Sequence, residues 1–160
     1  MSIVQRLEEL DIRLPELTEN PEALFALGSA AGAYVHLSGQ IPVVEGKPKY
    51  VGLVGSAVTM EQAQDAARLC VLNLLAALKT LVGDLDNVKR VVKLSGYVAC
   101  EHTFTNAPLV INAASQLLNH IFPDTSRHAR VAMGVVSLPA GAPVEIEMIV
   151  ELYSEAEPAS

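Results

Sequence analysis

Apolar residues recur at helical spacing in two long segments of this chain. The first segment begins after Thr59, where Gln62 completes a T-x-x-Q capping box, and it ends at Gly83. The second begins near Pro108, which suits the first turn of a helix, and ends before Pro123. These two segments are predicted to be the main helices of the fold.

Strand-like runs surround these helices. They cover Ala33–Gln40, Val88–Ala99 and two runs within His128–Tyr153, which are joined by the short turn PAGAP. A short amphipathic helix is expected over Ser2–Leu10. The order strand, helix, strand, helix, strand, strand predicts a single α+β or α/β domain with one sheet and two helices.

The last two strand-like runs carry charge where a core strand should be apolar. Arg130 lies near the start of the first run, and Glu145 begins the second, with Glu147 two residues on. Such charges are costly unless they are paired or used. In a hairpin closed near Pro139 to Pro143, Arg130 and Glu145 would lie on neighbouring strands, although the register stays open. The pair is then either a structural ion pair or a site in which Arg130 binds a carboxylate or phosphate.

The segment Val131–Val136 is apolar on both of its alternating faces. A strand that is buried on both faces needs cover on both, and two helices can cover only one face of a sheet. We therefore expect the other face to meet a second subunit in a homo-oligomer. The alternative is that the N-terminal segment folds over that face.

Composition limits the classes of function. The chain has 160 residues, enough for one domain with a substantial core, and a net charge of -7 that argues against sequence-independent binding of nucleic acid. No apolar run is long enough to span a membrane, and no secretory signal is recognisable. Cys70 and Cys100 lack CxxC spacing and are expected to be free thiols. A cytoplasmic protein without membrane association is expected.

Other polar residues carry weaker signals. The four histidines have no metal-ligand spacing, so no metal is expected. Gly39, which follows Ser38 at a strand end, could let a ligand approach the backbone, but from this residue alone a plain bulge is the better explanation. Asn112, in the sequence VINAAS, either faces a pocket or is a solvated helix residue.

Three segments together resemble the Rid/YjgF family of reactive intermediate imine deaminases, also labelled endoribonuclease L-PSP. They are SGQIP at residues 38–42, GDLDNV at residues 83–88, and the block ARVAMGVVSLP-x(4)-VEIEM that begins at Ala129. The chain looks closest to a longer branch of the family with an extra N-terminal segment. The resemblance suggests an extension over residues 1–20, the family domain over residues 21–153, and a polar tail over residues 154–160.

The resemblance implies a chorismate-mutase-like α+β fold with one mixed sheet. It also implies a homotrimer, assembled through the open sheet face, with clefts between the subunits. The best-known activity in the family is hydrolysis of 2-imino acids to 2-keto acids and ammonia, without a metal or organic cofactor. A small carboxylate-bearing substrate is therefore the expected ligand.

The resemblance also implies roles for individual residues. Arg130 matches the arginine that binds the substrate carboxylate, and Glu145 matches the glutamate that helps to place the attacking water. Gly39 matches a backbone contact near the reacting carbon, with Ser38 beside it. Asn112 matches a pocket asparagine on the second helix.

Two substrate-pocket positions depart from the family pattern. Phe25 stands where active members commonly have a tyrosine, and Ala132 stands where many have a cysteine. Two alternative functions therefore stay open: a non-catalytic regulator that binds small keto or amino acids, and an endoribonuclease. The acidic composition and the lack of a basic groove disfavour the endoribonuclease.

Overall fold

The computed structural model describes residues 1–123, 125 and 127–154, so most of the predicted tail lies outside the described residues. The elements in chain order are α1 (Ile3–Glu9), β1 (Gly28–Ala31), β2 (Tyr34–Gln40), β3 (Val43–Val44), β4 (Lys47–Pro48), α2 (Met60–Val82), η1 (Leu85–Asn87), β5 (Val88–Ala99), α3 (Ala107–Ile121), β6 (Ala129–Val135), η2 (Pro139–Gly141) and β7 (Val144–Leu152).

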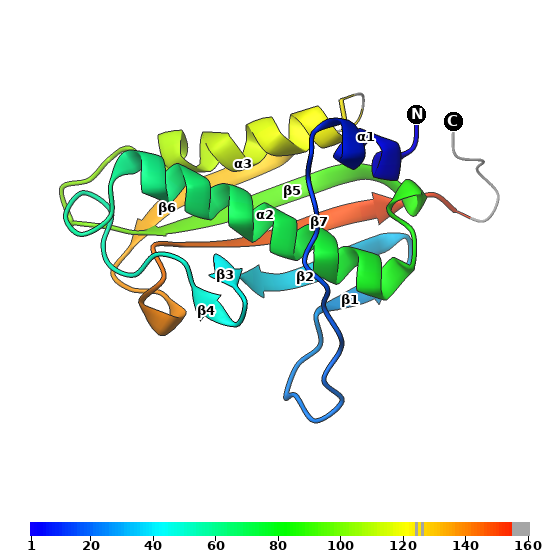
Figure 1. Ribbon diagram of the computed structural model, residues 1–160, viewed down its shortest axis with the longest axis horizontal. Helices are drawn as coiled ribbons and strands as arrows, with labels where there is room; N and C mark the ends of the chain where they lie inside the picture. The colour runs from blue at the N-terminus through cyan, green and yellow to red at the C-terminus, as the bar shows by residue number, and fades with distance from the viewer. Residues whose placement is uncertain (124, 126, 155–160) are drawn as a thin grey trace.

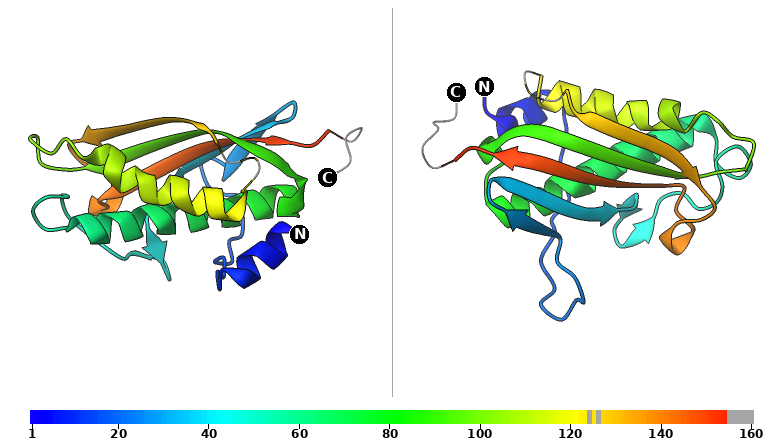
Figure 2. Two further views of the ribbon diagram at one scale, coloured as in Figure 1. Left: turned by 90° about the horizontal axis from the view of Figure 1, so that it is seen from above. Right: turned by 180° about the vertical axis from the view of Figure 1, so that it is seen from behind.

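Five strands form one mixed sheet in the order β1-β2-β7-β5-β6. Only the β5–β6 pair is parallel, and the other neighbours in this sheet are antiparallel. Helices α2 and α3 lie side by side on one face of the sheet (Figures 1 and 2). The predicted α+β fold, with a mixed sheet packed on two helices, is confirmed.

The predicted signals at both ends of α2 are present. Thr59 and Gln62 form the capping box, and Gly83 ends the helix with a φ of 78°, a conformation that favours glycine. The apolar face between these ends is buried against the sheet, where Leu74 meets a core that includes Leu94 and Ile146. The long helix thus forms as its sequence pattern predicts.

The predicted hairpin of the last two strands is wrong, because β5 lies between β6 and β7. Neighbouring strands are about 4.8 Å apart, so the connection from β6 to β7 must step across roughly 10 Å. Residues 136–143 make this step over the end of β5, where the Ala99 N–H donates to the Pro143 carbonyl. The PAGAP turn therefore joins strands that are not neighbours.

The N-terminal segment lies on the outer side of the helix layer (Figure 2). Leu7 of α1 is buried, and the N–H of Ile3 donates to Asp86 at 2.6 Å. Further along, the Thr80 hydroxyl donates to the carbonyl of Leu17 at 3.0 Å. The alternative in which this segment covers the open face of the sheet is therefore wrong.

Strand β6 is an edge of the sheet, and the described residues cover its apolar side chains only in part. Met133 is 45% exposed, and Val136, just beyond the strand, is 89% exposed. The described residues leave Met133 exposed on the sheet face away from the helices, which is the face that the sequence pattern predicts to meet a partner. The homo-oligomer that would cover it stays a prediction.

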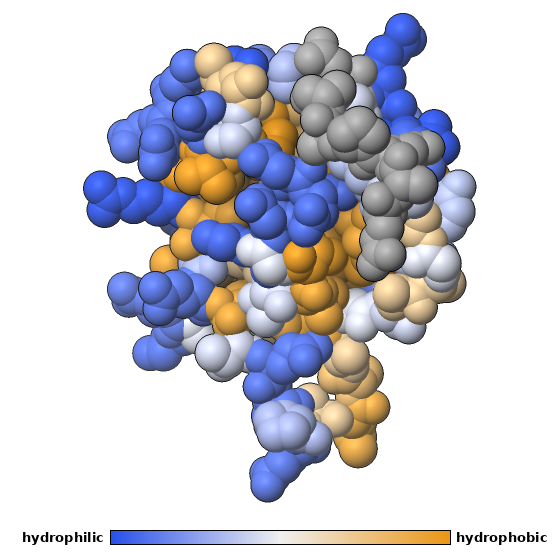
Figure 3. All heavy atoms as spheres, turned by 90° about the vertical axis from the view of Figure 1, so that its right-hand side faces the viewer, coloured by the Kyte–Doolittle hydropathy of each residue, from blue (hydrophilic) through white to orange (hydrophobic). Residues whose placement is uncertain are grey.

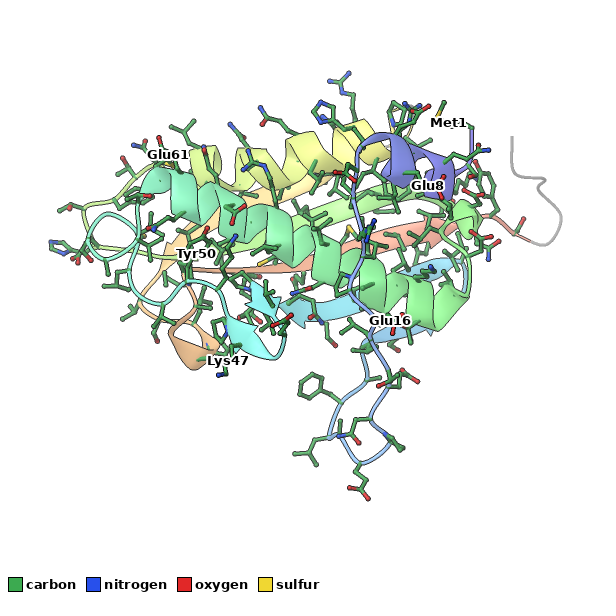
Figure 4. The ribbon with its side chains drawn as sticks, viewed as in Figure 1. Met1, Glu8, Glu16, Lys47, Tyr50 and Glu61 are labelled. Atoms are coloured by element: carbon green, nitrogen blue, oxygen red, sulfur yellow. The ribbon has the colours of Figure 1, made fainter. Side chains whose placement is uncertain are left out.

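Two segments outside the five-stranded sheet are held in different ways. The loop over residues 18–27 projects from the body, with hydrophobic atoms on one of its sides (Figures 1 and 3). The segment before α2 is fixed because Lys49 and Tyr50 both donate to the Asp65 carboxylate, at 2.9 and 2.7 Å. Tyr50 lies beside α2 in Figure 4. One loop is therefore tied to the helix layer, while the other stands away from it.

Within the described part of the chain, no helix combines the length and the apolar character needed to cross a bilayer. Cys70 and Cys100 are free and buried, as predicted.

Candidate functional site

The predicted site residues fall into two clusters. The first, which we call the arginine cluster, consists of Arg130, Asn112, Ser115, His128 and Ala132. In the parallel β5–β6 ladder, Arg130 lies opposite Leu94, which is fully buried under the helices. Side chains opposite one another in a ladder share a face, so the Arg130 side chain lies on the helix side of the sheet.

Helix α3 provides the hydrogen-bond partners of Arg130. Its Nη1 donates to Asn112 Oδ1 at 2.8 Å and to Ser115 Oγ at 3.2 Å. Ala132 lies two residues further along β6, opposite Gly96. A Cβ at Gly96 would lie 2.6 Å from the Ile111 side chain, so α3 packs directly on β5 at this point. This close packing brings Asn112, the next residue on α3, toward Arg130.

Ser115 and His128 were not among the predicted site residues. Ser115 Oγ lies 3.0 Å from His128 Nε2 as well as near Arg130. Spacing carried a signal for both: Ser115 is three residues after Asn112 on a helix, and His128 is two residues before Arg130 in an extended segment. Each therefore shares a face with a residue that the sequence motifs had indicated.

The second cluster, the glutamate cluster, consists of Glu145, Gly39, Ser38 and Phe25. Glu145 lies opposite Tyr97 in the β5–β7 ladder, and Tyr97 points away from the helices because it alternates with buried Val98. The β2–β7 register shifts between Leu37 and Gln40, and a Cβ at Gly39 would lie 2.4 Å from Glu145 Oε1. Glycine is therefore what makes room for this carboxylate.

The Glu145 carboxyl differs from that of its neighbour Glu147. Glu145 is half-buried, whereas Glu147 is exposed and accepts a hydrogen bond from the Tyr97 hydroxyl at 3.4 Å. Burial raises the pKa of Glu145 above its ordinary value of 4.5, and the nearby negative charge of Glu147 raises it further. A carboxyl of this kind can accept and return a proton closer to neutral pH than an ordinary one.

The other two residues of the glutamate cluster, Ser38 and Phe25, lie at the projecting loop over residues 18–27. The Ser38 hydroxyl donates to the carbonyl of Ala26 at 2.7 Å. Both residues line a hollow of about 580 Å³ beneath the loop, and the Phe25 side chain is 75% exposed. The loop therefore presents its aromatic ring outward, beside the strand that carries Gly39.

The two clusters lie on opposite faces of the sheet, with β5 between their strands. Arg130 and Glu145 therefore do not form an ion pair with one another, which removes the structural alternative left open by the sequence. Within one chain, the structure brings together the residues of each cluster but not the two clusters. A small ligand bound to one cluster therefore does not reach the other cluster of the same chain.

Metal and thiol chemistry have little support in the described residues. Across residues 1–123, 125 and 127–154, no three His, Cys, Asp or Glu side chains lie close enough together to hold a metal ion. Burial raises the pKa of the Cys70 and Cys100 thiols, which disfavours the reactive thiolate form. Among the predicted site residues, Arg130 and Glu145 are the two that carry charge.

The chain belongs to the family described as "YjgF/chorismate_mutase-like, putative endoribonuclease", whose match covers residues 5–155. This confirms the family suggested by the sequence motifs. A curated relative, "Protein TCP17" of Trypanosoma cruzi, is 38% identical over 151 residues, which are 94% of each chain.

Two solved structures resemble the whole chain. The protein Atu1372 of Agrobacterium tumefaciens, of unknown function, is 42% identical with a TM-score of 0.85, and the match covers 94% of this chain and 92% of that one. The second, from Shewanella oneidensis, is described as "a putative endoribonuclease". It is 28% identical with a TM-score of 0.89, and the match covers 95% of this chain and all of the other.

Proposed function

We propose that this protein hydrolyses 2-imino acids to 2-keto acids and ammonia, at a site formed by the arginine cluster of one copy and the glutamate cluster of another. The observation that carries this proposal is the unused part of the Arg130 guanidinium. Its Nη1 is bonded to α3, while no described residue accepts from Nε or Nη2. A planar fork with a free edge fits a carboxylate in bidentate fashion.

Glu145 supplies the proton chemistry. As the oxygen of a water molecule bonds to the carbon of a protonated C=N group, the ionised carboxylate takes one proton from that water. The product is a carbinolamine, and Glu145 returns the proton to its nitrogen. The C–N bond then breaks as the C=O bond forms, the hydroxyl proton passes to the Glu145 carboxylate, and ammonia leaves. Glu145 gives this proton to ammonia or to water, which restores the carboxylate. Imines hydrolyse readily, so orientation and a suitable base are sufficient.

An interface between two copies of the chain would bring the arginine cluster of one copy next to the glutamate cluster of the other. Strand β6 has an uncovered edge, and the projecting loop ends in two exposed hydrophobic side chains, Leu24 (102%) and Phe25 (75%). A cyclic assembly, such as the trimer that the sequence resemblance implies, would cover apolar surface of both kinds. Each interface would then contain one arginine cluster and one glutamate cluster.

At two positions, Phe25 and Ala132, this chain lacks the polar side chain that is common in the family, so the proposed site has fewer polar groups near the reacting carbon. Phe25 lacks a hydroxyl, and Ala132 lacks a thiol. The proposed chemistry needs neither, because Arg130 binds the carboxylate and Glu145 moves the proton. We therefore expect a rate enhancement that needs Arg130 and Glu145 but no tyrosine hydroxyl or cysteine thiol.

The direct test generates 2-iminobutanoate in situ with an amino-acid oxidase and follows 2-ketobutanoate formation in the presence of semicarbazide, which traps the free imine. The wild-type protein is expected to lower the trapped fraction, whereas Arg130→Ala and Glu145→Gln are expected to act as buffer does. No acceleration by the wild type across several imino acids would refute the proposal. Ligand-dependent thermal stabilisation without turnover, lost in Arg130→Ala, would identify a non-catalytic binder.

A further inference from the structure

We propose that Ser115 and His128 are positioning residues that determine which edge of the Arg130 guanidinium meets the ligand. This inference deepens the proposed function and rests on Arg130 binding a carboxylate. Neither residue takes part in the chemistry proposed above. Their role follows from the hydrogen bonds around Arg130.

A guanidinium has five N–H donors in one plane, and two of them are on Nη1. Those two have acceptors in Asn112 Oδ1 at 2.8 Å and Ser115 Oγ at 3.2 Å. The two acceptors are three residues apart on α3, so they lie on one face of the helix. Because both Nη1 hydrogens are engaged, the edge formed by Nε and Nη2 is the one that remains for a carboxylate.

Ser115 is in turn oriented by His128. Arginine cannot accept a hydrogen bond, so Ser115 Oγ accepts from Arg130, and its own hydrogen is free to point elsewhere. His128 Nε2 lies 3.0 Å away and accepts that hydrogen when the imidazole is neutral with its proton on Nδ1. His128 is half-buried and directly precedes β6, so the same backbone places the imidazole and Arg130.

Removing the Ser115 hydroxyl leaves one Nη1 hydrogen without an acceptor. The Nη1 group can then rotate more readily about the Cζ–Nη1 bond, and the guanidinium is held less firmly. The carboxylate loses a fixed partner, although Glu145 and its water are unaffected. We expect Ser115→Ala to raise the KM and the Kd for the carboxylate about tenfold, the effect of one hydrogen bond to a charged group. The kcat should stay within about twofold, because the proton chemistry belongs to the other cluster.

The test compares Ser115→Ala, Ser115→Thr and His128→Ala with Gln116→Ala, an exposed neighbour on α3 that serves as a matched control. ¹⁵N NMR of the ligand-free protein measures rotation of the Arg130 Nη1 group, with Arg130→Lys used to assign the signal. Titration with 2-ketobutanoate, imine kinetics and thermal unfolding complete the set.

Slow Nη1 rotation in the wild type, faster rotation in Ser115→Ala and His128→Ala, and recovery in Ser115→Thr are expected, with unchanged midpoints of thermal unfolding. Fast rotation in the wild type, or no change in Ser115→Ala, would overturn the proposal. A rise in KM that only accompanies a fall in thermal stability would also overturn it. If the wild type neither binds 2-ketobutanoate nor hydrolyses imines, the proposed function fails, and the NMR result still decides the positioning role.

Discussion

At the scale of single residues, the candidate site depends on missing side chains as much as on charged ones. Gly39 leaves the space that the Glu145 carboxylate occupies, since a Cβ there would lie 2.4 Å from Oε1. The φ of Gly39 lies outside the left-handed region, so its backbone tolerates a larger residue. The glycine is therefore needed for room and not for backbone freedom.

Gly39→Ala is expected to displace the Glu145 carboxylate and lower kcat by about 10- to 100-fold, because a misplaced catalytic group loses most of its effect. The thermal midpoint should change little, since only the flexible end of Glu145 must move. Steady-state imine kinetics and thermal unfolding check this. In a Glu145→Gln background the same substitution should cost no further activity, and an equal loss in both backgrounds would contradict the argument.

Ionisation of Glu145, whose pKa is raised, is expected to favour activity but to lower the stability of the fold. Its folded-state pKa lies above the unfolded value, so ionised Glu145 destabilises the fold at neutral pH, and this penalty disappears as the pH falls below the unfolded pKa. Glu145→Gln should therefore raise the thermal midpoint at pH 7 to 8, with no gain near pH 4, while activity is lost. An equal midpoint difference at both pH values would rule out this account.

Substitution of the exposed neighbour Glu147 tests the pKa shift of Glu145 without changing Glu145 itself. The negative charge of Glu147 adds to the rise in the pKa of Glu145. Glu147→Gln should therefore move the acid limb of the kcat/KM profile to lower pH and keep the maximal rate. An unchanged profile would show that the acid limb belongs to another group.

At the scale of elements, the helices were predictable from sequence and the strand order was not. Capping at Thr59 and apolar spacing are local signals, and they predicted α2 correctly. The pairing of β6 and β7 with β5 depends on residues more than thirty positions apart, and the PAGAP turn suggested a hairpin that does not form. Local patterns therefore indicate candidate site residues but not their arrangement.

The contact between β5 and α3 connects packing to the site. A Cβ at Gly96 would lie 2.6 Å from fully buried Ile111, the residue before Asn112. Gly96→Ala should destabilise the fold by about 1–3 kcal/mol through overpacking and push Asn112 and Ser115 away from Arg130. The midpoint of thermal unfolding should fall by roughly 2–4 °C per kcal/mol.

Ile111→Val supplies the compensating change for this prediction, because it removes one of the methyl groups that a new Cβ would strike. The double variant should recover part of both the stability and the affinity for 2-ketobutanoate. Strictly additive losses in the two variants would show that the contact does not transmit packing to the arginine cluster.

At the scale of the whole molecule, one chain carries the two halves of the proposed site on opposite faces of its sheet. The arginine cluster lies on the helix side of edge strand β6, and the glutamate cluster lies on the open face beside β2. The apolar pattern of Val131–Val136 by itself indicates a partner, yet no signal in the sequence shows that Arg130 and Glu145 point apart. That division follows from strand register alone.

Mixing two inactive variants tests whether the site is shared between copies. Arg130→Ala keeps the glutamate cluster and Glu145→Gln keeps the arginine cluster, so each alone should be inactive. The two variants are mixed in equal amounts, unfolded and refolded together. A shared site takes Arg130 from one copy and Glu145 from another, and under random assembly each of these copies is the intact one half of the time. About a quarter of the sites should therefore be intact. We therefore expect roughly a quarter of the wild-type activity from the mixture, and none from either variant refolded alone or from a double variant mixed with either. If the refolded mixture is oligomeric but its activity stays at the background level, the site is not shared between copies. Because Arg130 and Glu145 lie on opposite faces within one chain, they could then not act on the same substrate.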